Sequence, residues 1–214
     1  MKQFLSVLSL AAILASCTGM GGAKSGRAIN VAISGAGGKT IYFDKFVNGK
    51  PVHIDSTVLD GDGEGTLHVP RLPLDYYRLM ISEGEQTILA LDSTDEVTVE
   101  AKADSMFLPT RISGSPKSEA LISFYRAAGG MEREMNDFMQ QNAHGSDDPS
   151  AMMRMNQLRD AYTNFLHKAI AENPGTPVSL AACGKVNMEQ ELDLFAKVAA
   201  DLKPTMGGGG FSKS

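Results

Sequence analysis

The chain is poor in the residues that build redox chemistry. Its 214 residues include two cysteines, Cys17 and Cys183, and no tryptophan. No CxxC pair is present, so we expect no thioredoxin-type redox centre. If Cys17 is acylated, as argued below, no disulfide can form and Cys183 is a lone thiol. Its apolar, Ala-rich surroundings predict a buried side chain rather than a nucleophile.

Long apolar runs and an excess of basic residues are also missing. The apolar run over residues 4–14 is too short for a membrane-spanning helix, which needs about 20 residues. The formal net charge of −5 gives no sign of a basic surface. We therefore expect neither a membrane-spanning helix there nor a nucleic-acid partner.

Familiar catalytic signatures do not occur. The chain has no HExxH, GxSxG or Ser-x-x-Lys motif. Its histidines have no paired metal spacing, and one of them, His53, is expected on the outer face of a strand; they are His53, His68, His144 and His167. We therefore assign no catalytic, metal-binding or cofactor-binding residue, and we expect a protein that is not an enzyme.

The first residues have the form of an export signal. Lys2 precedes the apolar run, and small residues follow it up to Cys17. The last four, "LASC", resemble the lipobox of bacterial lipoproteins, in which a peptidase cuts before the cysteine and acyl chains are attached to it. The resemblance implies a signal peptide over residues 1–16 and lipidation of Cys17. The alternative is an ordinary cleavage site with an incidental cysteine.

Lipidation would place the protein in the cell envelope. Each buried CH₂ of an acyl chain contributes about 0.8 kcal/mol, so several chains give a permanent anchor. The small residues over 17–26 would form a tether. No acidic residue follows Cys17 directly, whereas surface-exported relatives tend to carry one there. We therefore expect the periplasmic face of the outer membrane.

Residues 27–113 have a sequence pattern that is typical of antiparallel strands. Short β-branched segments, mostly with apolar residues at every second position, are separated by Gly, Asn, Asp and Pro. Seven segments follow this pattern: "AINVAIS", "KTIYFDKFV", "PVHIDSTVL", "GTLHVP", "YYRLMIS", "QTILAL" and "EVTVEAK". They predict a sandwich or meander of about seven to eight strands.

Two glycine-rich stretches imitate ligand loops. "ISGAGGKT" has Ile33 where a phosphate-binding loop needs Gly, and the following residues alternate like a strand, so we interpret it as a hairpin turn and expect no nucleotide. "DGDGEG" opens like a calcium loop, but Arg71 stands where a bidentate Glu is needed. A tight turn between strands explains it, with weak calcium binding as the alternative.

Residues 114–204 change to helical periodicity. Ser115 followed by Pro116 is typical of a helix start, and the apolar spacing predicts three to four helices, with a break near Gly184. Residues 205–214 have no apolar pattern, so we expect disorder there. Methionines cluster in two of these helices: Met131, Met135, Met139, Met152, Met153 and Met155. We expect them to fill contacts between helices, with Cu(I) binding as the alternative. The fold class is therefore α+β.

The order of these motifs resembles a known family. A lipobox, then "HIDSTVLDGDGEGTLHV", "ALDSTDEVTVEA", "ISGSPKSEALISFY" and "NPGTPVSLAA", is similar to the amino-terminal region of thioredoxin-like (AhpC/TSA-type) lipoproteins of Gram-negative anaerobes. That region is known as domain of unknown function 4369. The resemblance covers about residues 27–200. It implies that a redox domain with CxxC would follow, but the sequence has "TMGGGGFSKS" there.

Two functions follow as expectations. The first is a membrane-anchored periplasmic lipoprotein that acts as a non-enzymatic interaction module. The alternative is an accessory subunit of a thiol–disulfide exchange system, which docks a separate thioredoxin-like protein.

Overall fold

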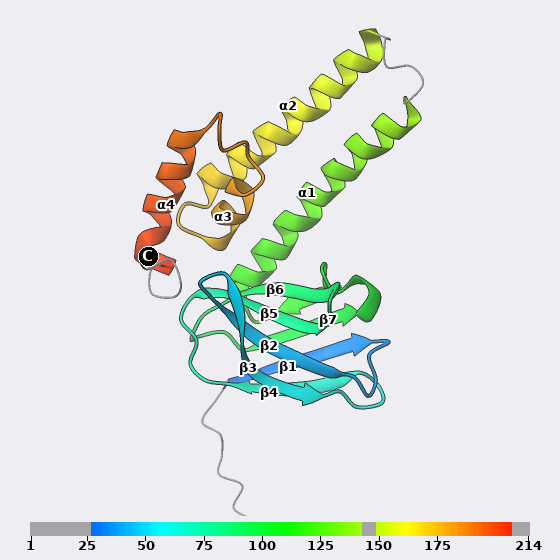
Figure 1. Cartoon of the computed structure of the whole chain (residues 1–214), viewed down its shortest axis with the longest axis vertical. Helices are drawn as coiled ribbons and strands as arrows, with labels where there is room; N and C mark the ends of the chain where they lie inside the picture. The colour runs from blue at the N-terminus through cyan, green and yellow to red at the C-terminus, as the bar shows by residue number, and fades with distance from the viewer. Residues whose placement is uncertain (1–26, 143–148, 207–214) are drawn as a thin grey trace, which may run out of the picture.

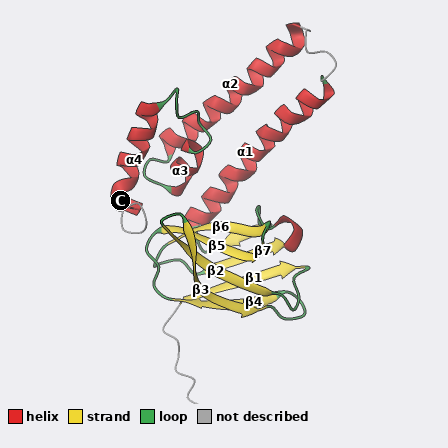
Figure 2. Ribbon diagram, viewed as in Figure 1, coloured by secondary structure: helices red, strands yellow, loops and turns green. Residues whose placement is uncertain are grey.

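Two four-stranded sheets pack face to face in the computed structural model, which describes residues 27–142 and 149–206 (Figures 1 and 2). Sheet A has the order β4-β1-β7-β8 and contains β1 (Arg27–Ser34), β4 (Glu64–Val69), β7 (Val97–Lys102) and β8 (Arg111–Ser113). Sheet B has the order β3-β2-β5-β6 and contains β2 (Thr40–Val47), β3 (Lys50–Val58), β5 (Asp75–Ser82) and β6 (Glu85–Leu91). All seven predicted segments form strands, which confirms the α+β fold class.

The strand pairing is antiparallel with one exception. Five strand pairs run antiparallel, whereas β1 and β7 run parallel, with Ile29 opposite Val97. Parallel neighbours need a long connection between them. Here the connection is the whole chain from β2 to β6, most of which lies in sheet B.

The sandwich core follows from the alternation of the strands. Every second side chain of β1 points inward, and Ile29, Val31 and Ile33 are at most 3% exposed. In sheet B, the rings of Phe43 and Tyr77 stack with centroids 5.4 Å apart. Because side chains alternate between faces with a period of two, the same strands leave a second, outer face on each sheet.

Each of the two glycine-rich stretches connects a strand of one sheet to a strand of the other. The two connections also pack against each other. "ISGAGGKT" joins β1 of sheet A to β2 of sheet B, so the interpretation as a hairpin turn is wrong. Ile33 donates its backbone N–H to Gly63 of the second stretch at 2.8 Å. A Cβ on Gly63, whose φ is +83°, would lie 2.2 Å from the Ile33 carbonyl oxygen. Close backbone contact between the two loops therefore explains this glycine.

The helices begin after the last strand. They are α1 (Pro116–Gln141), α2 (Pro149–Glu172), α3 (Pro177–Cys183) and α4 (Leu192–Met206), with a short 3₁₀ turn at η1 (Ala103–Ser105). The predicted break is present, since Gly184 caps α3. α1 and α2 form a long hairpin that extends away from the sandwich (Figure 1). Residues 1–26, 143–148 and 207–214, which include the expected signal peptide, tether, Cys17 and most of the expected tail, lie outside the described residues.

A second apolar core joins the helices to one another and to sheet B. The rings of Phe124 and Phe165 stack with centroids 5.6 Å apart, which fixes α1 against α2. Val178 of α3 and Val198 of α4 are buried in the same cluster. Tyr76 of sheet B packs against it, so this core holds the helices on the sandwich.

Polar contacts at the start of α1 fix the helix on β6, an edge strand of sheet B. The Ser118 hydroxyl donates to the Ala90 carbonyl at 2.9 Å and accepts from the Ala90 backbone N–H at 3.0 Å. Ser115, the N-cap, accepts from the Ser118 N–H, and its hydroxyl lies 3.0 Å from Asp95 Oδ2. Both serines are fully buried. The preceding Gly114 has φ of +83°, and a Cβ there would lie 1.8 Å from the Glu96 carbonyl oxygen.

We predict that Ser118→Ala destabilises the protein by about 1–3 kcal/mol, because it leaves the buried N–H of Ala90 without a partner and removes one of the two hydroxyl donors to the Ala90 carbonyl, the other being Ser115. The matched control is Ser123→Ala, an exposed serine of the same helix, which should change the free energy of unfolding by less than about 0.5 kcal/mol. Chemical denaturation followed by circular dichroism measures both. Equal losses in the two variants would contradict this role of Ser118.

Candidate functional site

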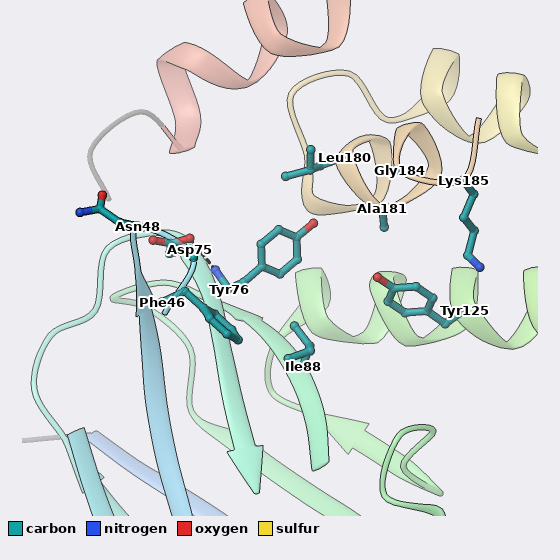
Figure 3. Close-up of a pocket in the computed structure, with 11 residues that line it drawn as sticks. Phe46, Asn48, Asp75, Tyr76, Ile88, Tyr125, Leu180, Ala181, Gly184 and Lys185 are labelled. Atoms are coloured by element: carbon teal, nitrogen blue, oxygen red, sulfur yellow. Dashed lines mark hydrogen bonds between the residues drawn. The ribbon is translucent and has the colours of Figure 1, made fainter. Parts of the chain in front are cut away.

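An apolar cleft lies where the helices meet the outer face of sheet B (Figure 3). Its volume is about 770 Å³. Strands β2, β5 and β6 supply one wall, and helices α1 and α3 supply the other. Its lining includes Phe46, Asp75, Tyr76, Tyr125, Leu180 and Lys185. We call this space the cleft.

The pleat of sheet B explains why Tyr76 and Ile88 share a face, whereas Asp75, the first residue of β5, lies opposite Leu91 and lines the cleft at the end of the strand. Tyr76 of β5 lies opposite Ala90 of β6, so it points to the same side as Ile88, two residues before Ala90. Its neighbour Tyr77 points into the sandwich core and is 1% exposed. The pair "YY" therefore supplies one ring to each face of the sheet.

Tyr76 also closes the contact between the sheet and the helices. Its hydroxyl donates to the carbonyl of Pro177, the first residue of α3, at 2.6 Å. Burial raises the pKa of this phenol far above its usual value, with smaller contributions from Tyr125 and Asp75. The hydroxyl therefore stays protonated and acts as a fixed donor across the junction.

The cleft has a charged residue at each end (Figure 3). Lys185 forms an ion pair with Glu132 of α1 at 2.7 Å, and the Tyr162 hydroxyl donates to the same carboxylate. Asp75 lies at the other end, where its Oδ1 accepts from the Tyr76 N–H at 2.8 Å. Burial raises the pKa of Asp75, and the Tyr76 hydrogen bond lowers it by a smaller amount.

A second polar cluster lies on the same face of sheet B. Asp44 of β2 is 5% exposed, and Arg78 of β5 donates to its Oδ2 from Nε at 3.0 Å and from Nη2 at 2.6 Å. His53 Nδ1 lies 3.3 Å from the other oxygen. The His53 side chain is 52% exposed, as expected for an outer-face residue. This cluster neutralises Arg78, so the arginine is not free to attract an anion.

Cys183 and the loop "DGDGEG", which the sequence singled out, do not line the cleft. Cys17 is outside the described residues. Cys183 is buried at 3% exposure in α3, and burial raises the pKa of its thiol, with Glu191 adding to the effect. Within residues 27–142 and 149–206, no three His, Cys, Asp or Glu side chains are grouped so that they could hold a metal ion. Asp60 of "DGDGEG" accepts backbone N–H groups from Asp62 and Glu64.

The methionines of α1 lie in the second half of that helix and those of α2 in its first two turns, within the hairpin that extends away from the sandwich (Figure 1). Met139, Met152 and Met153 are exposed, whereas Met131 and Met135 are partly buried. The contact between the helices in this region includes an ion pair of Arg154 and Glu134 at 3.1 Å. Filling of helix contacts stays the prediction for these methionines, with Cu(I) binding as the alternative.

Sequence reasoning missed the cleft. Its walls come from residues that are up to 139 positions apart, from Phe46 to Lys185. The one local signal is "DYYR", where two adjacent aromatic residues in a strand must point to opposite faces and one of them must leave the sandwich core.

Comparisons with protein-family models, with curated proteins and with solved structures found no match. None of the helices in the part of the chain that the structure describes is long and apolar enough to span a bilayer.

We predict that Tyr76→Phe lowers the free energy of unfolding by about 1 kcal/mol, because the hydrogen bond to Pro177 is lost while the ring stays. The control is Tyr42→Phe, on the same face of sheet B; Tyr42 is 38% exposed, and its hydroxyl has no hydrogen-bond partner within the described ranges. Urea denaturation of both variants checks this. A loss in Tyr42→Phe as large as in Tyr76→Phe would show that the junction bond is not responsible.

Proposed function

We propose that the protein is a lipid-anchored interaction module of the cell envelope, which binds a partner in the cleft and does not transform it. The observation that carries the proposal is the cleft, a concave space with a volume of about 770 Å³. Its lining is mostly apolar and includes a few polar groups. Surfaces of this kind are the usual binding sites of proteins. The Tyr76 bond to Pro177 and the Lys185 pair with Glu132 hold its walls in place before a partner arrives.

The environment of Cys183 supports binding rather than redox chemistry. Thiol–disulfide exchange requires an accessible thiolate. The side chain of Cys183 is buried in the helical core, and its pKa is raised, so the protonated thiol is favoured. The proposed function therefore gives Cys183 no redox role.

The anchor and the location are parts of the same proposal. They are supported by the lipobox that ends at Cys17 and by the resemblance to the amino-terminal region of thioredoxin-like lipoproteins. In this proposal the folded part stands off the periplasmic face of the outer membrane on residues 17–26. The same resemblance supports the alternative, an accessory subunit that docks a separate thioredoxin-like protein.

Photo-crosslinking tests the binding surface. We expect a benzoylphenylalanine at Ile88, in the cleft, to yield a discrete crosslinked partner in envelope preparations. The same residue at Val58, which is 66% exposed on β3 and does not line the cleft, should not yield it. Mass spectrometry identifies the partner, and a CxxC protein would select the alternative. Crosslinking that is equal at both positions, or absent at both in folded protein, would refute the cleft as the binding surface.

Substitution of the anchor residue tests the location. We expect Cys17→Ala to abolish labelling with palmitate and to release the protein from the membrane fraction, because the acyl chains supply the binding energy. Cys183→Ala serves as the matched control and should keep both labelling and membrane association. Unchanged fractionation of Cys17→Ala would show that the lipobox interpretation is wrong.

A further inference from the structure

Asp75 is the charged group of the cleft that lacks an opposite charge. One of its oxygens accepts the Tyr76 N–H at 2.8 Å. In the two described ranges, no Lys, Arg or His side chain forms an ion pair with it. A partly desolvated carboxylate without a counter-ion is costly, and a cation placed beside it would offset part of that cost.

Lys185, the cation that lines the cleft, already has a partner, as does Arg78 on the same face of sheet B. Lys185 is paired with Glu132 at 2.7 Å, and Arg78 is held by Asp44 at 2.6 Å. Neither carries a free positive charge that would attract an anionic ligand. The unbalanced charge of the cleft is therefore negative and lies at its Asp75 end (Figure 3).

The aromatic walls favour the same type of occupant. Phe46, Tyr76 and Tyr125 line the cleft, and the face of an aromatic ring attracts a cation. Tyr125 is held in place by contacts with the rings of Phe107 and Phe124. Lysine and arginine carry apolar stems that can lie along such walls while their charged ends reach a polar group.

We propose that the cleft binds a lysine or arginine side chain of a protein partner, flanked by an aromatic or aliphatic residue, with the cationic end on Asp75. The proposal rests on the proposed function, in which the cleft is the binding surface, and it adds the chemistry of the partner. A segment of a protein fits better than a small molecule because the space is an open cleft and not an enclosed cavity. The chain's net charge of −5 also favours the approach of a cationic partner.

The test uses a matched set of peptides and the full chain. The first peptide is Gly-Phe-Lys-Phe-Gly, acetylated and amidated at its ends and carrying a fluorophore. The second has Gln in place of Lys, and the third has Glu. Fluorescence anisotropy gives the dissociation constants. We expect the Lys peptide to bind at least about tenfold more tightly than the Gln peptide, because a charge-assisted contact is lost, and the Glu peptide to bind more weakly still.

Asp75→Asn then locates the contact. This variant removes the charge and keeps the shape, so we expect the Lys peptide to lose about tenfold in affinity and the preference for Lys over Gln to disappear, as a double-mutant cycle requires for two groups in contact. The control is Asp62→Asn, an exposed residue of the loop between β3 and β4, which should keep both the affinity and the preference. Circular dichroism verifies that each variant is folded.

Three results would overturn this proposal. They are equal binding of the Lys and Gln peptides to the wild-type protein, a preference for Lys that survives in Asp75→Asn, and tighter binding of free 4-phenylbutylamine than of the Lys peptide, which would identify a small-molecule site. The crosslinking at Ile88 separates this failure from a failure of the proposed function. A partner captured there, together with no preference for Lys, would refute the cationic occupant and leave the cleft as the binding surface.

Discussion

The two hydrogen bonds between the Ser118 hydroxyl and the backbone of Ala90 fix the position of the helices relative to sheet B. Both polar groups of Ala90 point away from β5, and an edge strand with such groups exposed is prone to pair with other chains. The serine hydroxyl satisfies both and thereby fixes the first turn of α1 on β6. Tyr125 lies seven residues further, two helical turns along the same face of α1, which brings it over sheet B as a wall of the cleft.

Much of the fold could be predicted because its signals are local. In each strand, apolar and polar residues alternate within the segment itself. The start of α1 at Ser115-Pro116 and the break at Gly184 also depend on a few neighbouring residues. The parallel pairing of β1 with β7 could not be predicted. An alternating strand such as "INVAI" has the same pattern whichever partner it takes, so the sequence does not reveal which strands become neighbours.

The cleft was beyond sequence reasoning for a related physical reason. Phe46, Tyr76 and Tyr125 each have an ordinary local role, in a strand or on a helix face, and they line one cleft only because the start of α1 is fixed on β6. The unpaired state of Asp75 is likewise a property of the whole arrangement, since it depends on where every cation of the described chain is placed. Cys17 is the opposite case: four consecutive residues predict its role, and that role stays a prediction.

The parallel pairing of β1 with β7 also has a kinetic consequence. Ile29 and Val97 are direct neighbours in sheet A although 68 positions separate them in the chain. Contacts of such long separation slow folding, because the entropy of closing the loop is lost before the contact stabilises anything. We therefore expect the first strand to remain without this partner until the chain through Lys102 is available. The contacts within the α1–α2 hairpin are closer in sequence, so we expect this hairpin to form early and to pack on the sandwich later.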